Sequence, residues 1–222
     1  MKVKVITVGE KVLVANEVKA RENKIRLDKR RILTINIMSS PGAGKTSLIL
    51  STIRHFKNKA RIAVIEGDVA SSVDADKVNE LGIPVIQINT AGGCHLDANM
   101  VAEALDGLPL EKTDILFIEN VGNLICPNNY ALGEDSKIMI SSLPEGDDKP
   151  YKYPAMFADT GVVLLNKIDL QPYLDFNMDA FRKVVTGLNP DVSIFPVSCK
   201  TGAGMAEWFS WLEAAMSVKK NR

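Results

Sequence analysis

A cysteine and a histidine stand side by side at Cys94 and His95, directly after two glycines. The chain contains only three cysteines and two histidines, so this pairing uses two rare residues at once. A further cysteine, Cys126, lies in the segment ENVGNLICPNN (119–129). Thiolate and imidazole groups are suitable ligands for Zn²⁺ or Ni²⁺. If the strands before these segments end at one edge of a sheet, Cys94, His95 and Cys126 would converge on a metal ion.

The residue pattern alone leaves other readings of these residues open. Cysteine is often buried as a small hydrophobic residue, and His95 could instead begin a helix. No closely spaced pair such as Cys-x-x-Cys supports a metal site. Three ligands from one chain would leave a coordination position open, whereas a site on a two-fold axis would take both cysteines from each chain.

A phosphate-binding loop is predicted at residues 39–46, SSPGAGKT, between an apolar run and a helix-like run at 45–56. Backbone N–H groups and the helix N-terminus would hold the phosphates there. Lys45 would reach the β- and γ-phosphates, and the Thr46 hydroxyl would bind Mg²⁺. Ser39 stands where the pattern G-x-x-x-x-G-K-[ST] has glycine. The predicted nucleotide-binding residues of this loop are Ser39, Ser40, Gly42, Ala43, Gly44, Lys45, Thr46 and Ser47.

A guanine-binding element is predicted at NKID (166–169), at the end of a strand-like run. Asp169 can accept hydrogen bonds from N1–H and the exocyclic amine of guanine, which adenine does not present together. The stem of Lys167 can lie along the base, and Asn166 can brace neighbouring loops. The segment SCKTG would contact the guanine oxygen through its backbone, which adds Ser198, Cys199 and Lys200. With the phosphate loop, these elements predict a GTP-binding protein.

Acidic residues at two strand ends complete the predicted catalytic set. Asp68 ends IAVIEGD, and Glu119 lies near the end of ILFIEN, three residues before Gly122. We expect Asp68 and Glu119 to support Mg²⁺ directly or through water, and Asp68 to orient the attacking water. The N–H of Gly122 would donate a hydrogen bond to the γ-phosphate, which Lys45 would also contact. Either acid could instead only cap a loop. For Glu119 this alternative has a specific reason, because glutamate replaces the usual aspartate of the Asp-x-x-Gly switch. No arginine is placed as an arginine finger, so slow hydrolysis is expected.

Short apolar runs alternate with helix-like segments along most of the chain, which predicts an α/β fold with a mostly parallel sheet flanked by helices on both faces. The runs expected as strands are 31–38, 61–67, 83–89, 114–120, 137–143, 161–167 and 192–198. Residues 1–31 are predicted to form an N-terminal helical extension, and residues 32–222 a P-loop GTPase domain. The stretch 143–159, rich in proline, glycine and charge, is predicted as a long loop.

The composition favours an ordinary globular protein. The 222 residues are 46% hydrophobic, and 27 basic residues balance 27 acidic ones, so no net charge attracts nucleic acid or a membrane surface. The sequence predicts no signal peptide and no membrane span. Three widely separated cysteines do not indicate a disulfide framework, so a cytoplasmic location is expected.

In this order, NIMSSPGAGKT, EGD, CHLDANMV, FIENVGNLICP, NKIDL and SCKTGAG resemble the hydrogenase nickel-incorporation GTPases, the HypB family, from near Ile35 to the C-terminus. The resemblance implies a P-loop fold of the SIMIBI type. It also implies a GTP-dependent homodimer that binds Ni²⁺ or Zn²⁺ through Cys94, His95 and Cys126. The implied role is nickel delivery during [NiFe]-hydrogenase maturation, with a small zinc-containing nickel chaperone and, indirectly, the hydrogenase large subunit precursor.

Departures from the family refine these expectations. No cysteine precedes Cys94, and the other histidine is His55, late in the helix predicted after the phosphate loop. A second nickel site or a histidine-rich storage tract is therefore not expected. Cys199 lies in the guanine loop and is predicted not to be a ligand. The urease nickel-insertion GTPase is the first alternative, but its Cys-Pro-His run is here Cys126-Pro127-Asn128. A small-molecule kinase or a pure binding switch remains a further alternative, and either would tolerate loss of both cysteines.

The N-terminal segment carries a basic face that we interpret as solvated. It comprises Lys19, Arg21, Lys24, Arg26, Lys29, Arg30 and Arg31. A sharper hypothesis is that Val12, Leu13 and Val14 dock the chaperone. Deleting residues 1–20 should then abolish that association and leave GTP binding intact.

Overall fold

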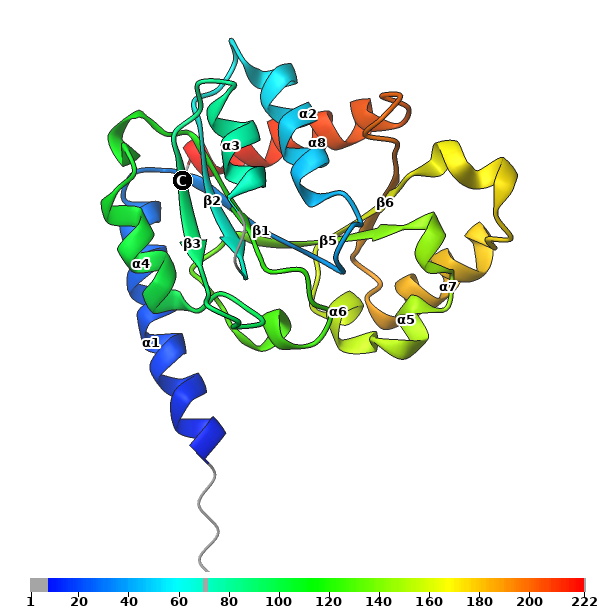
Figure 1. Ribbon diagram of the computed structural model, residues 1–222, viewed down its shortest axis with the longest axis horizontal. Helices are drawn as coiled ribbons and strands as arrows, with labels where there is room; N and C mark the ends of the chain where they lie inside the picture. Colours follow the sequence, from blue (N-terminus) through cyan, green and yellow to red (C-terminus); the bar gives the residue numbers. More distant parts are fainter. Residues whose placement is uncertain (1–7, 70–71, 222) are drawn as a thin grey trace, which may run out of the picture.

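Seven parallel strands form one sheet in the order β3-β2-β4-β1-β5-β6-β7 (Figure 1). The computed structural model describes residues 8–69 and 72–221, with side chains from residue 12 onward. The strands are β1 (Leu33–Ser39), β2 (Ile62–Asp68), β3 (Val85–Asn89), β4 (Ile115–Glu119), β5 (Ser136–Ser142), β6 (Val162–Asn166) and β7 (Ser193–Pro196). Every run expected as a strand is one, which confirms the predicted α/β fold.

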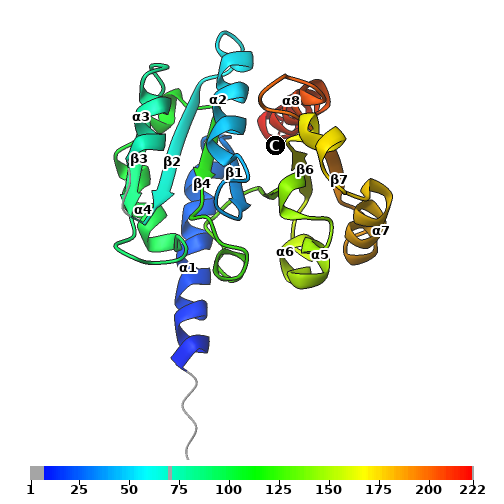
Figure 2. The same cartoon turned by 45° about the vertical axis from the view of Figure 1, so that its right-hand side comes forward.

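Helices cover both faces of this sheet, with α2, α3 and α8 on one face and α1, α4, α5, α6 and α7 on the other (Figures 1 and 2). The helices are α1 (Val8–Asp28), α2 (Lys45–Phe56), α3 (Val73–Asn79), α4 (Ala98–Asp106), α5 (Lys149–Lys152), α6 (Pro154–Ala158), α7 (Met178–Leu188) and α8 (Met205–Lys220). Every residue of β1 is buried, as expected for a central strand that is covered on both faces. None of the helices in the described part of the chain combines the length and apolar character that a membrane span needs.

The carboxyl ends of the strands collect the predicted site residues at one edge of the sheet. β1 ends at Ser39, β4 at Glu119 and β6 at Asn166, and all three strands run in the same direction. Ligands of open α/β sheets bind outside this edge, near the point where the strand order reverses. The fold therefore places phosphate loop, acidic residues and guanine element side by side.

The N-terminal helix α1 packs along the domain and extends beyond it at its first residues (Figure 1). Its buried stripe comprises Asn16, Ala20, Asn23 and Leu27, spaced at intervals of three and four residues as one helix face requires. Leu27 belongs to the core cluster formed by α4 and the sheet. The basic residues Arg21, Lys29, Arg30 and Arg31 are exposed.

The stretch 143–159 is not a long loop, so that prediction was wrong. It forms a 3₁₀ helix over Leu143–Glu145, followed by α5 and α6. A proline stands within the first two positions of each segment, where its fixed φ favours a helix and its missing N–H costs nothing. These prolines mark helix starts rather than breaks.

Candidate functional site

The phosphate loop joins β1 to α2, with Gly44 as the residue that precedes the helix. Gly44 has φ 111°, and a Cβ there would lie 2.3 Å from Nδ2 of Asn166, so glycine is required on both counts. The Lys45 ammonium lies 3.2 Å from the Ser39 hydroxyl. Ser39 is buried at the end of β1, so serine in place of the first glycine orients the lysine instead of breaking the loop.

The guanine element is tied to the phosphate loop through Asn166 and Lys167. Asn166 donates to the Ala43 carbonyl at 2.9 Å and accepts from the Cys199 N–H at 3.1 Å, so it braces both loops as expected. The Lys167 ammonium donates to the Gly42 carbonyl at 2.7 Å. Lys167 also has φ 64°, a strained backbone that recurs at functional sites.

Asp169 is oriented by a neighbouring hydroxyl. Ser198 Oγ donates to its carboxylate at 2.6 Å and accepts from the Thr201 N–H at 3.1 Å. A pocket of about 580 Å³ opens beside Asp169, large enough for a nucleoside. Its lining residues are Gly42, Gly44, Ser47, Asn166, Lys167, Asp169, Leu170, Cys199 and Lys200. Most of the residues predicted from NKID and SCKTG therefore line one pocket with the phosphate loop.

An acidic cluster lies beside the phosphate loop. Carboxylate oxygens of Glu66, Asp74 and Glu119 lie within 4.8 Å of one another. The Thr46 hydroxyl donates to Glu119 at 3.0 Å, so two of the three predicted Mg²⁺ ligands are adjacent. The remaining predicted Mg²⁺ ligand, Asp68, does not belong to this cluster of carboxylates as found among the described residues. Sequence reasoning missed Glu66, two residues earlier on the same face of β2, and Asp74, in the first turn of α3.

Burial raises the pKa values of Glu66 and Glu119 in this cluster. Burial and the neighbouring Glu119 raise the pKa of Glu66 to about 11, and burial raises the pKa of Glu119 against the opposing effect of Lys45. Oε2 of Glu66 and Oε2 of Glu119 are buried without a hydrogen-bond partner among the described residues. An oxygen-rich, under-satisfied cluster of this kind suits a hard divalent cation.

Replacing Glu66 by Gln should stabilise the metal-free protein. A folded-state pKa above the ordinary value of 4.5 means that wild-type stability declines as pH rises above that value. Glu66→Gln removes this loss and should raise the free energy of unfolding in EDTA by about 1 kcal/mol or more at pH 8. Urea unfolding at pH 5 and pH 8 measures the effect. A variant less stable than wild type at pH 8 would contradict the arrangement.

Two further residues contact the phosphate loop. A Cβ on Gly122 would lie 3.1 Å from Pro41, so glycine permits the segment after β4 to approach the loop. The Ser40 hydroxyl is hydrogen-bonded to the Glu145 carboxylate, which also accepts from the Ser142 N–H at 2.8 Å. Glu145 belongs to the stretch expected as a loop, so it was not predicted as part of the site.

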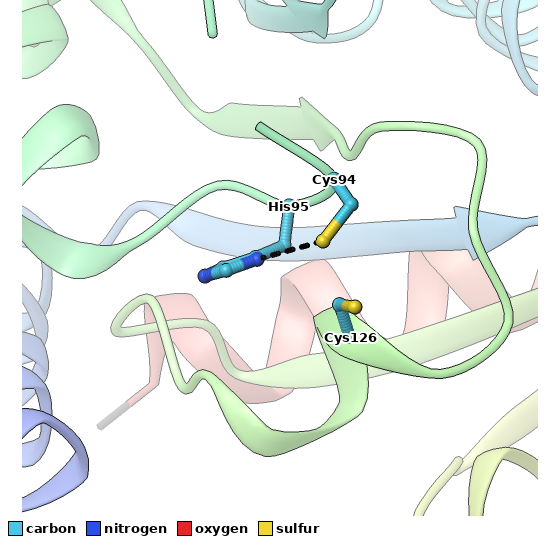
Figure 3. Close-up of side chains that lie close together, drawn as sticks. All are labelled: Cys94, His95 and Cys126. Atoms are coloured by element: carbon cyan, nitrogen blue, oxygen red, sulfur yellow. Dashed lines mark hydrogen bonds between the residues drawn. The ribbon is translucent and has the colours of Figure 1, made fainter. Parts of the chain in front are cut away.

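The predicted metal ligands meet at the same edge of the sheet. One ligand atom from each of Cys94, His95 and Cys126 lies within 4.8 Å of the others. Cys94 Sγ is 3.5 Å from His95 Nδ1, and Cys126 faces both from the short helix Cys126–Asn129 (Figure 3). The His95 ring stacks on Tyr130, with ring centroids 3.8 Å apart. All three ligands are half-buried, as a site that exchanges metal requires.

The protonation of the cysteines and histidines follows from their surroundings. A hydrogen bond with Cys94 raises the pKa of Cys126, and burial lowers the pKa of His95, which favours the neutral imidazole that a metal needs. Burial raises the pKa of the Cys199 thiol to about 11, in keeping with its predicted non-ligand role. His55 lies in the last turn of α2, stacked on Phe209.

Asn120 connects the Cys94–His95 segment to the end of β4. Its side chain, fully buried, accepts from the Leu96 N–H at 3.1 Å and from the Val121 N–H at 2.9 Å. Leu96 directly follows His95, and Asn120 directly follows Glu119. A single side chain thus joins the Cys94–His95 segment to the strand end that carries the acidic cluster.

Replacing Asn120 by Leu should be strongly destabilising. It leaves the N–H groups of Leu96 and Val121 without acceptors, at a cost of about 1–3 kcal/mol each, so a total loss of roughly 2–6 kcal/mol is expected. Urea unfolding of the metal-free protein measures it. Asn129→Leu, an exposed asparagine on the same segment, is the matched control. Equal stability of the two variants would show that Asn120 does not hold these segments.

Comparisons with known proteins agree with this geometry. The family described as "CobW/HypB/UreG, nucleotide-binding domain" matches residues 33–196. "Hydrogenase maturation factor HypB" of Escherichia coli (strain K12) is 46% identical over 202 residues, which cover 91% of this chain and 70% of that protein. "Hydrogenase/urease maturation factor HypB" of Helicobacter pylori (strain ATCC 700392 / 26695) is 39% identical over 211 residues, covering 93% and 86%.

Solved structures of such proteins superpose closely on this chain. HypB from Archaeoglobus fulgidus gives a TM-score of 0.86 at 34% identity, covering 91% of this chain and 99% of that one. HypB from Helicobacter pylori in complex with nickel gives 0.87 at 38% identity, covering 91% and 95%. The chain therefore belongs to the CobW/HypB/UreG family and, within it, to the HypB hydrogenase maturation factors.

Proposed function

We propose that this chain is a GTP-hydrolysing metallochaperone that binds nickel and supports its insertion into [NiFe]-hydrogenase. The observation that carries the proposal is the segment 119–126. It begins at Glu119 beside the phosphate loop and ends at Cys126 in the Cys-His-Cys cluster. This eight-residue segment would therefore connect the place where a γ-phosphate would lie to a metal ligand, so a nucleotide-dependent shift of one end would reach the other.

Mg²⁺ fits the acidic cluster beside the phosphate loop. The Thr46 hydroxyl and the carboxylates of Glu119 and Glu66 would hold it, because their buried Oε2 atoms lack partners among the described residues. When bound, Mg²⁺ neutralises charge on the β- and γ-phosphates. Asp68 remains our candidate for orienting the attacking water.

The chain's own residues account for nucleotide binding and slow hydrolysis. Lys45, held by Ser39, would contact the transferred phosphoryl group, and the N–H of Gly122 would donate to it. Asp169, oriented by Ser198, would accept hydrogen bonds from the guanine edge. Asn166 would hold the phosphate loop next to the loop that contains Cys199. No arginine is proposed to assist, so turnover should be slow.

Nickel is the proposed cargo of Cys94, His95 and Cys126, and zinc is an alternative metal for the same ligands. Thiolate and imidazole ligands within 4.8 Å can share one ion, either in one chain with an open position or across a two-fold axis. A GTP-dependent homodimer is part of the proposal. Exposed apolar side chains on loops beyond β2 and β4, Val69 and Ile125, suit such an interface.

A zinc-containing nickel chaperone is the proposed partner, docking at the N-terminal helix. Val12 and Val14 are 49% and 61% exposed, which suits an apolar docking surface. The hydrogenase large subunit precursor would receive nickel indirectly, in the cytoplasm, with no nucleic acid or membrane involved. The name of the Helicobacter pylori relative makes urease maturation the second candidate function.

One experiment tests the proposed function as a whole. Nickel-dependent maturation of [NiFe]-hydrogenase would be measured in cells that carry this chain as their only such factor. We expect maturation with wild type and none with a Cys94→Ala/Cys126→Ala variant that still binds GTP. A small-molecule kinase or a pure binding switch would tolerate the double substitution, so full maturation with that variant would reject the proposal.

A further inference from the structure

Two asparagines interrupt the buried stripe of α1. Asn16 and Asn23 are 4% and 3% exposed, in line with Ala20 and Leu27. Burial of an amide is unfavourable unless hydrogen bonds compensate it, so alanine or leucine would serve simple packing better. These two amides therefore perform a specific task.

Asn16 joins the two segments that carry the metal ligands. Its Oδ1 accepts from the Ala98 N–H at 2.8 Å, and its Nδ2 donates to the Ala131 carbonyl at 2.9 Å. Ala98 lies three residues after His95, and Ala131 directly follows Tyr130. Because the His95 ring stacks on Tyr130, both partners of Asn16 are covalently close to groups that set the position of His95.

Asn23 repeats this connection two turns further along the helix. Its Nδ2 donates to the Ala98 carbonyl at 2.8 Å and to the Leu132 carbonyl at 3.1 Å. Both backbone polar groups of Ala98 are thus bound by α1. Close approach is possible because of Gly133, which has φ 101° and where a Cβ would lie 2.8 Å from Cβ of Asn23.

We infer that α1 is part of the metal site, and that Asn16 and Asn23 are positioning residues that hold the Cys94–His95 and Cys126–Tyr130 segments in register. The inference deepens the proposed function, because it names a helix outside the nucleotide pocket as a determinant of nickel affinity. Any change that moves α1 will alter the arrangement of Cys94, His95 and Cys126. By linkage, nickel binding will alter the stability of α1 to the same extent.

Leucine at either position removes the amide while it keeps the side chain's size. Partners that orient metal ligands typically contribute about 10- to 100-fold to metal affinity. We expect Asn16→Leu and Asn23→Leu each to weaken Ni²⁺ binding by about that factor, measured with Ni²⁺ alone by competition with a chelator. The thiolate-to-nickel charge-transfer band should shift, which mere loss of stability would not cause.

Two further variants separate positioning from general docking of α1. Arg26→Ala removes the Arg26–Asp106 ion pair at 2.6 Å and the bond to the Leu105 carbonyl, which join α1 to the far end of α4. This control should leave nickel affinity unchanged. Asn16→Asp keeps an acceptor for the Ala98 N–H and loses the donor to Ala131, so it should bind nickel more tightly than Asn16→Leu.

A metal-free readout keeps this inference separate from the proposed function. Hydrogen exchange of the Ala98 amide should accelerate by at least about 10-fold in Asn16→Leu and stay unchanged in Arg26→Ala. If wild type binds no nickel, the proposed function fails, and the exchange result alone decides whether α1 positions these segments. Wild-type nickel affinity in both folded leucine variants, together with wild-type Ala98 exchange in Asn16→Leu, would overturn the inference.

Discussion

Replacing Asp169 by Asn should convert the chain from a GTP-binding protein into one that prefers xanthosine triphosphate. The carboxylate offers acceptors to two guanine donors, whereas the amide places an NH₂ against the guanine amine. Charged hydrogen bonds contribute about 1.5–3 kcal/mol each, so GTP affinity should fall roughly 10²- to 10⁴-fold. Xanthine carries a carbonyl in place of that amine, and it can accept from the new NH₂. Displacement of a fluorescent nucleotide measures both affinities.

The matched control for this experiment is Asp175→Asn, which removes a negative charge at an exposed position in the segment between β6 and α7. Its GTP affinity should equal that of wild type. The Ser198 hydroxyl, 2.6 Å from the Asp169 carboxylate, can also donate to an amide oxygen, so the side chain should keep its position. Undiminished GTP binding by Asp169→Asn would mean that the pocket does not read guanine through Asp169.

Nickel affinity should fall strongly when Cys126 is replaced by Ala. Cys126→Ala removes one of three ligands, and the loss should exceed the roughly 10- to 100-fold effect of outer-sphere partners. GTP affinity should be unaffected, because Cys126 does not line the nucleotide pocket. Competition with a chelator gives the nickel affinity of each variant.

Cys199→Ala is the matched control, since it removes a half-buried thiol outside the cluster. It should bind nickel as wild type does, because Cys199 is not one of the three residues whose side chains lie together in the cluster. Equal nickel affinity in Cys126→Ala and Cys199→Ala would exclude the Cys-His-Cys site.

The sequence predicted the sheet because its strands are buried on both faces. Runs such as residues 62–65 (IAVI) and 162–165 (VVLL) are continuous in apolar residues, a signal that needs no tertiary information. The phosphate loop and NKID were recognisable for a related reason, because the chemistry of phosphate and guanine requires particular residue types at fixed local spacing. Asn166 illustrates the success: its bracing role follows from its place at a strand end.

Contacts between distant segments were not predictable from local pattern. Glu66 reads as one residue of a buried strand, and only the register of β2 with β4 places it directly opposite Glu119. Asn120 and Glu145 likewise gain their partners through tertiary packing. Asn16 and Asn23 lie in a helix whose basic residues dominate the pattern, and that masks the polar positions on its buried side.

The role of α1 changes how the chaperone experiment should be designed. Deleting residues 1–20 removes Asn16 together with Val12 and Val14, so it would disturb the metal-bearing segments as well as the docking surface. Val14→Asp changes an exposed side chain and leaves both asparagines in place. We expect it to weaken chaperone association, measured by titration calorimetry, without altering nickel affinity.

We propose that the nucleotide and nickel sites are coupled through the segment 119–126. Equilibrium dialysis of Ni²⁺ against the wild-type protein, first with GDP and then with a non-hydrolysable GTP analogue, tests it most directly. We predict that nickel affinity or stoichiometry differs between the two nucleotides, and that the difference vanishes in Cys126→Ala. About one metal per two chains would indicate a site on a two-fold axis. Nickel binding that is absent, or identical with both nucleotides, would contradict the account.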